Sequence, residues 1–183
     1  MSNVSHVNAE VEDLSVAILR YPGGALAQIT SSVVHHGEEQ QLVFQGANAR
    51  VSASWHISAS NAKPNGFPVP NVQLADELQA MYDSLPEVTY EGHTGQVDNV
   101  LTAIETGAPI LIDGESGRRT LELIVAIYKS ASRGQNVNFP IGPDDPFYTR
   151  EGMQENAIRF YEKNTSIENF HDNTITIGSD YKG

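Results

Sequence analysis

The chain has 183 residues, with 23 acidic residues against 11 basic ones, a formal net charge of −12 and no cysteine. A chain of this length can bury the core of one domain, and the missing cysteines exclude disulfides, a thiolate nucleophile and Cys-ligated metals. The negative charge repels phosphate backbones, which argues against nucleic acid as a partner. The sequence has neither a membrane-length apolar run nor a signal-peptide pattern, so we expect a cytoplasmic protein without a membrane partner.

The first half of the sequence predicts an antiparallel sheet. Runs rich in strand-forming residues are separated by short turns that contain glycine, proline or asparagine. The expected strands cover residues 14–21, 25–34, 40–45 and 51–58. In the last run apolar and polar residues alternate with a period of two, so that Trp55 lies on an apolar face and His56 on a serine-rich face. Four strands joined in this way indicate a meander with one apolar and one more polar face.

Helices are expected after the strands. Residues 59–72 contain three prolines and three asparagines and predict a long loop. Apolar stripes predict helices over residues 74–85, 94–107 and 115–131, followed by a short strand over 136–141 and a polar tail over 161–183. Strands first and helices afterwards are typical of the α+β class. We therefore expect a single α+β domain over residues 1–160, sheet-rich over 11–58 and helical over 74–134.

The segment "DGESGRR" (113–119) lies where an apolar run gives way to a helix, so it invites comparison with a phosphate-binding loop. It has only the spacing G-x-x-G, and Asp113 and Glu115 put negative charge where an anion would bind. The same acids suit a helix start, with Asp113 as the N-cap. Arg118 and Arg119 then fall inside the helix, where they can pair with acids such as Glu122. We interpret the segment as a helix cap.

Two longer stretches resemble a known family. "VEDLSVAILRYPGGALAQITSS" (11–32) followed by "LVFQGANARVS" (42–52) looks like the sheet of the C-terminal domain of the Gfo/Idh/MocA oxidoreductases. "GQVDNVLTAIETGAPILIDGESGRRTLELIVAIYKSASRGQNVNFPI" (95–141) is similar to the closing segment of that domain. The resemblance implies an open-faced, mostly antiparallel sheet with helices packed on one side. It also implies subunits that associate through the sheet face as homodimers or higher oligomers.

Members of this family bind NAD(P) in an N-terminal Rossmann domain and oxidise or reduce sugars, inositols and related polyols by hydride transfer. The fingerprint G-x-G-x-x-G, the family's E-K-P with its proton-transfer lysine, and the D-x-x-x-H motif with its catalytic histidine occur nowhere in this sequence. We therefore expect no catalytic and no cofactor-binding residue here. The resemblance implies NAD(P) through a missing domain, which a Rossmann-domain partner could also supply.

Four residues are candidates for substrate binding. His56 could donate a hydrogen bond to a sugar hydroxyl with Trp55 or Phe67 as an apolar platform, and Lys63 could bind a carboxylate or phosphate. His93 precedes the second predicted helix, where it could contact a substrate at the helix N-terminus. A surface or interface histidine, a solvated loop lysine and a structural cap are the alternatives for these positions.

The sequence gives less support to a metal site or to catalysis by a serine nucleophile. His35 and His36 precede Glu38 and Glu39, but adjacent residues on an extended backbone point to opposite faces, so we expect no metal site there. No serine stands in G-x-S-x-G.

Two functions follow from the sequence. The first is the substrate-binding and oligomerisation domain of an NAD(P)-dependent sugar or polyol oxidoreductase, not catalytic in isolation. The alternative is a stand-alone carbohydrate-binding or protein-assembly module derived from the same fold.

Overall fold

The computed structural model describes residues 1–3, 11–33 and 41–160. Contacts divide the chain into two compact units. Unit 1 comprises the described residues within 1–36 and 110–183, and unit 2 those within 37–109. The extent of a single domain over residues 1–160 stays a prediction, and the polar tail predicted over 161–183 lies outside the described residues.

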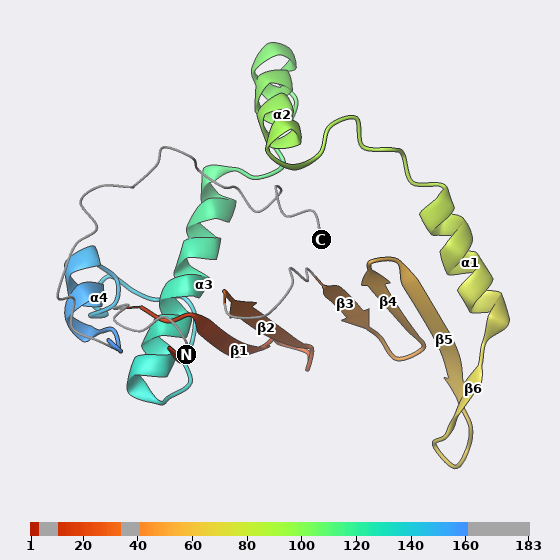
Figure 1. Cartoon of the computed structure of the whole chain (residues 1–183), viewed down its shortest axis with the longest axis horizontal. Helices are drawn as coiled ribbons and strands as arrows, with labels where there is room; N and C mark the ends of the chain where they lie inside the picture. The colour runs from red at the N-terminus through yellow and green to blue at the C-terminus, as the bar shows by residue number, and fades with distance from the viewer. Residues whose placement is uncertain (4–10, 34–40, 161–183) are drawn as a thin grey trace. The chain divides into compact units, whose positions relative to one another are not determined.

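Unit 1 contains a β-hairpin and two helices. Their bounds are β1 Leu14–Arg20, β2 Leu26–Ser32, α3 Gly114–Arg133 and α4 Arg150–Asn156 (Figure 1). The two strands pair antiparallel from Leu14 opposite Ser32 to Arg20 opposite Leu26. The turn between them needs Gly23 and Gly24, whose φ angles of 90° and 92° are strained for residues with a side chain. The first predicted hairpin is thus confirmed.

The core of unit 1 forms between α3 and the chain that leads to α4. Phe147 is the most buried large side chain, at 1% exposed, and the Arg133 guanidinium lies 5.7 Å from the centre of its ring. Ala126 of α3 and Ile141 are also buried. An ion pair between Lys129 and Asp145 joins the same two segments.

Unit 2 is a four-stranded antiparallel sheet in the order β3-β4-β5-β6, together with two helices. Their bounds are β3 Leu42–Gln45, β4 Ala49–Ala53, β5 His56–Ala62, β6 Pro68–Pro70, α1 Val72–Asp83 and α2 Gly92–Thr106. Helix α1 packs along β5 (Figure 1). Asn71 caps α1 by accepting a hydrogen bond from the Leu74 amide, and its side-chain amide donates to Asn61 on β5.

The strand predicted over residues 51–58 is wrong, because a tight turn at Ser54 and Trp55 divides it into the end of β4 and the start of β5. Ser52 pairs with His56 and Val51 pairs with Ile57 across this hairpin. Three residues separate Ser52 from His56, so the paired residues of the two strands are both even-numbered or both odd-numbered. Even-numbered residues therefore lie on one face of the hairpin and odd-numbered residues on the other. The alternation along the sequence is therefore the same for one strand as for this hairpin.

The long loop predicted over residues 59–72 is also wrong. β5 continues to Ala62, and β6 pairs with it from Pro68 opposite Ala62 to Pro70 opposite Ser60. The Lys63 amide, just after β5, donates to the Phe67 carbonyl, and the Asn71 amide donates to the Ala59 carbonyl on β5. The alternate positions, which the prolines occupy, therefore turn their nitrogens to the open edge of the sheet. Proline is tolerated at such an edge because no ladder hydrogen bond is lost there.

The prediction that four strands form one meander is wrong, because β1 and β2 form one sheet and β3 to β6 form another. The short strand predicted over residues 136–141 is wrong as well, since this segment has no strand pairing. The Ile141 amide instead donates to the Glu122 carboxylate on α3, at 2.7 Å. The three long helices and the α+β class are confirmed.

Candidate functional site

An open pocket lies at the β4–β5 turn of unit 2. It has a volume of about 330 Å³. Seven described residues line it: Gln41, Arg50, Ser52, Ala53, Ser54, Trp55 and His56. Two of the predicted site residues, Trp55 and His56, thus meet at one cavity. Its volume is at the small end of the range for ligand sites, which suits a molecule of monosaccharide size.

The strand register explains why these side chains gather. Ser52 lies opposite His56, and Arg50 lies opposite Ser58. Directly opposed residues of an antiparallel pair share a face, as do residues two apart on one strand. Arg50, Ser52 and His56 therefore project from the same face of the sheet.

Trp55 is held by helix α1. The ring of Tyr82 stacks on the indole with 3.8 Å between centroids and 10° between planes. The indole Nε1 donates to Gln79 Oε1 at 2.9 Å, and the amide nitrogen of Gln79 donates to Asp83 at 2.7 Å. This chain of contacts fixes the orientation of Trp55, which still has 36% of its surface exposed and lines the pocket.

The polar groups of the pocket can bind several oxygens. Ser52 is 6% exposed and its hydroxyl donates to the Ser54 carbonyl at 3.1 Å, which leaves its oxygen able to accept. Arg50 is half-buried, and within the described residues no carboxylate forms an ion pair with it. The lining combines a guanidinium, an imidazole, an amide and hydroxyls with one indole.

The other two predicted site residues do not line this pocket. Lys63 lies in the β5–β6 turn, where its amide donates to the Phe67 carbonyl at 2.9 Å. The seven residues of β5 separate it from the β4–β5 turn, a distance of roughly 20 Å at the usual rise of a strand. His93 does not precede α2 as expected but lies within its first turn, with Nδ1 3.1 Å from Gln96 Oε1. The helix begins at Gly92, two residues before the predicted start at residue 94, and Glu91 is its N-cap.

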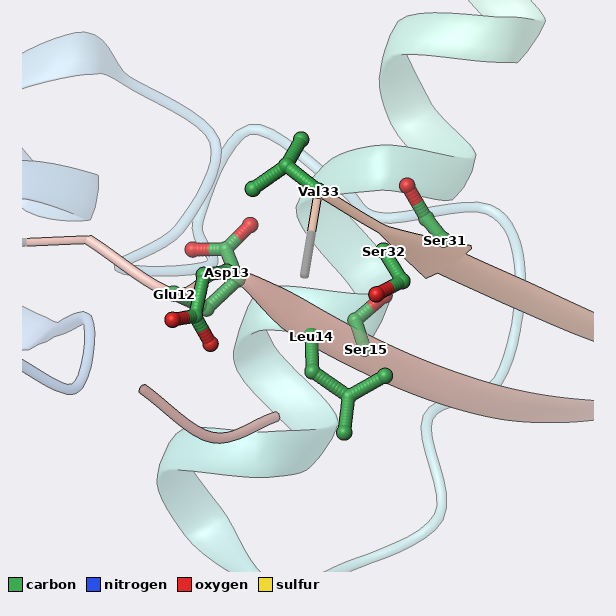
Figure 2. Close-up of a pocket in the computed structure, with 7 residues that line it drawn as sticks. All are labelled: Glu12, Asp13, Leu14, Ser15, Ser31, Ser32 and Val33. Carbon is green, nitrogen blue, oxygen red and sulfur yellow. The ribbon is translucent and has the colours of Figure 1, made fainter. Parts of the chain in front are cut away.

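Unit 1 has a second, smaller pocket of opposite character. It has a volume of about 130 Å³ at the point where β1 begins and β2 ends. Figure 2 shows its lining residues: Glu12, Asp13, Leu14, Ser15, Ser31, Ser32 and Val33. Two carboxylates disfavour an anion there, and the volume is below the range of ordinary ligand sites.

One of these carboxylates serves the fold. The Tyr128 hydroxyl of α3 lies 2.7 Å and 2.6 Å from the two carboxylate oxygens of Glu12, to which it donates. Burial, and then the adjacent carboxylate, raise the pKa of Tyr128 well above its ordinary value, so the phenol stays a donor. Glu12 thereby ties the start of β1 to α3.

The N-terminus of α3 does not fit a phosphate group. The Asp113 side chain accepts from the Ser116 amide at 2.8 Å, and this hydrogen bond lowers the pKa of Asp113. Arg118 donates two hydrogen bonds to Glu115, and they lower the pKa of that carboxyl to about 2. The Asp113 carboxylate thus already binds an amide that a pyrophosphate would need, and Glu115 adds a second negative charge to this first turn. The predicted cap is confirmed, as is the predicted pairing of Arg118 with Glu122, at 3.1 Å.

Two further predictions concern sites outside these pockets. Among residues 1–3, 11–33 and 41–160, no three acidic, histidine or cysteine side chains form a group that could hold a metal ion. The pair His35 and His36 lies outside the described residues. None of the helices in the described part of the chain is long and apolar enough to cross a membrane.

Sequence reasoning missed Arg50 and Gln41 as pocket residues. The signal for Arg50 was present, since it lies two residues before Ser52 and so continues the polar face that contains His56. No local pattern could identify Gln41, which reaches the pocket from the chain before β3.

Comparison with known proteins agrees with this architecture. Residues 2–139 match the Gfo/Idh/MocA family model described as "Oxidoreductase family, C-terminal alpha/beta domain". The match covers well over half of the 183 residues, so the chain belongs to this family through its C-terminal domain. Neither the curated proteins nor the solved structures gave a match to the chain.

The cap of α3 predicts an acid titration. Because the folded state lowers the pKa of Glu115 from 4.5 to about 2, its stabilising effect is complete above pH 4.5 and is lost as the pH falls toward 2. Replacing the main partner, Arg118→Gln, should raise the pKa of Glu115 part of the way back to 4.5, since Arg119 still contacts it at 3.3 Å. Carboxyl ¹³C NMR during a pH titration measures this value. Arg20→Gln is the matched control, and a Glu115 pKa near 4.5 in the unaltered chain would contradict the assignment.

Proposed function

We propose that this chain is the substrate-binding and oligomerisation domain of an NAD(P)-dependent oxidoreductase that acts on sugars or polyols. Membership of an oxidoreductase family through its C-terminal domain supports the reaction class. The observation that carries the substrate class is the pocket at the β4–β5 turn, where an indole adjoins hydroxyl, amide, imidazole and guanidinium groups.

The lining suits a polyhydroxylated ligand for a simple physical reason. Each sugar hydroxyl both donates and accepts hydrogen bonds, and a buried hydroxyl without a partner is unfavourable. The side chains of Ser52, His56 and Gln41 offer donors and acceptors together. The C–H groups of a sugar ring pack on an aromatic surface, which Trp55 provides in a fixed orientation.

The nicotinamide cofactor would bind in a Rossmann domain and not in this chain. When bound there, it supplies the hydride acceptor or donor for the carbon that reacts. The carboxylates at the start of α3 oppose a pyrophosphate, and the sequence carries neither the dinucleotide fingerprint nor the family's lysine and histidine motifs. The residues of this domain would hold the substrate in place, and the chain by itself would not turn it over.

The binding role is tested with the single tryptophan of the chain. Trp55 emission should change saturably when the full chain is titrated with sugars and polyols such as glucose and myo-inositol. His56→Ala should weaken that binding about threefold to tenfold, which corresponds to the loss of one hydrogen bond. His93→Ala is the matched control and should leave the binding unchanged, because His93 does not line the pocket.

The same chain should show no tight binding of NADH by isothermal titration calorimetry. A saturable response to no sugar or polyol would contradict the substrate-binding role. Micromolar affinity for NADH would contradict the assignment of the cofactor to another domain.

The oligomerisation role is supported by an apolar surface on the β1–β2 hairpin. Val16 and Ile18 are 54% and 65% exposed in unit 1, and Leu26 is 63% exposed on the same face, opposite Arg20. Apolar side chains grouped on an exposed sheet face are typical of protein contacts, since burying them from water is favourable. A second copy of the chain would bury this face, as the family resemblance also suggests.

Light scattering after size-exclusion chromatography tests this role. The unaltered chain should be a dimer or a larger oligomer, and Ile18→Asp should shift it toward the monomer because a carboxylate would be buried at the contact. Val88→Asp is the matched control, since Val88 is 74% exposed in the segment between α1 and α2. A strict monomer at high protein concentration would refute the oligomerisation role.

A further inference from the structure

The geometry points to a sugar that carries an oxyanion, either a carboxylate or a phosphate, as the ligand of the β4–β5 pocket, with Arg50 as the residue that binds the anionic group. This inference rests on the proposed function and names the substrate class of the same site. Three observations support it: the position of Arg50, the absence of a carboxylate partner for Arg50 among the described residues, and the contrast with the pocket of unit 1.

Arg50 is held in the middle of the sheet and not at a free end. It lies on β4 opposite Gln45 of β3 on one side and opposite Ser58 of β5 on the other. Two neighbouring strands thus fix its backbone, and its side chain is half-buried while it lines the cavity. Arginine at such a position places its planar group of N–H donors reproducibly, which a lysine at a loop tip would not do.

The charge of Arg50 is not neutralised within the described chain. Two arginines of α3 do have carboxylate partners, since Arg118 pairs with Glu115 and Glu122 and Arg119 pairs with Glu115. Among the described residues no such partner reaches Arg50, although the chain has 23 acidic residues. None of the seven described residues that line the pocket is acidic. A half-buried cation without a counter-ion favours a ligand that supplies one.

The hydrogen-bond geometry of the Arg50 guanidinium suits an oxyanion. A guanidinium can donate two parallel hydrogen bonds to a carboxylate or to a phosphate, and such charge-assisted pairs are stronger than neutral ones. His56 and Ser52 lie on the same face as Arg50, so the rest of a sugar could contact them while its anionic group meets the guanidinium.

The overall charge of −12 opposes anions at long range but does not decide binding at this pocket. Charges on the protein surface are screened over about 8 Å at physiological ionic strength. A guanidinium in direct contact with an oxyanion is hardly screened, so the local pair outweighs the distant charges. The pocket of unit 1, where Glu12 and Asp13 meet, has the opposite preference and provides a contrast within the chain.

The test compares three sugars of one carbon skeleton. The full chain is titrated with gluconate, glucose 6-phosphate and glucose at constant ionic strength, and Trp55 emission reports binding. At least one of the two anionic sugars should bind about tenfold or more tightly than glucose, as a charge-assisted hydrogen-bonded pair implies. Preference for gluconate identifies a carboxylate ligand, and preference for glucose 6-phosphate identifies a phosphate ligand.

Variants at one position show whether Arg50 causes the preference. Arg50→Gln should abolish the preference for the anion, because it weakens the binding of the anionic sugars far more than the binding of glucose, and Arg50→Lys should keep part of that preference. Arg20→Gln is the matched control, because it removes the same charge from an exposed strand arginine, which lies on β1. Circular dichroism checks that each variant is folded. If Arg50→Gln does not fold, Arg50→Lys provides the readout, since it keeps the charge but loses the planar group of donors and should reduce the preference without abolishing it.

Two results overturn the inference in distinguishable ways. Equal affinity for glucose and both anions, or the same effect from Arg50→Gln and Arg20→Gln, refutes the anionic ligand while the sugar-binding role stands. No response to any of the three sugars refutes the sugar-binding role, and this inference with it.

Discussion

The antiparallel register between β4 and β5 is the constraint on which the chemistry of unit 2 depends. Because Ser52 lies opposite His56, a residue two positions before Ser52 must share their face, and that residue is Arg50. A shift of the register by one residue would turn Arg50 and Ser52 to the other face and separate them from His56. The cap of α1 and the stacking of Tyr82 on Trp55 hold the helix against this same hairpin.

The two units place their charges differently. In unit 1 several charged groups bind other side chains, as Lys129 does with Asp145 and Glu12 with the Tyr128 hydroxyl. These contacts join α3 to the start of β1 and to the chain before α4, so the charges serve the fold. In unit 2 the pocket keeps a guanidinium that no described carboxylate neutralises. This difference distinguishes a site for a ligand from a set of structural ion pairs.

Sequence patterns predicted the helices and the class of the fold well. The cap at Asp113 and the alternation around Trp55 are local signals, and each acts within a few residues. The turn at Ser54 and Trp55 could not be predicted, because a hairpin with this register preserves the alternation of a single strand. The sequence around Pro68 and Pro70 predicts a loop, because only the pairing with β5 shows that these prolines lie at an open sheet edge.

In the site, too, local sequence patterns can predict some of the residues, whereas contacts between residues far apart in the sequence cannot be predicted in this way. Trp55 and His56 meet at one cavity because Trp55 lies in the β4–β5 turn, whereas adjacent side chains on one extended strand would point to opposite faces. The positions of Lys63 and His93 depend on where elements end. Arg50 could have been found by extending the polar face by two residues. The hydrogen bond between Trp55 and Gln79 joins residues 24 positions apart, and no periodic pattern in the sequence predicts such a contact.

The central claim is that the polar face of the β4–β5 hairpin is where this oxidoreductase-family domain binds its substrate. Amide chemical-shift mapping of the full chain with gluconate and with glucose 6-phosphate tests it most directly. The account predicts that the largest shifts fall on Arg50, Ser52, Trp55 and His56, while the amides of the unit 1 pocket, from Glu12 to Ser15, do not move. Shifts confined to the residues of the unit 1 pocket, or spread evenly over both units, would contradict it.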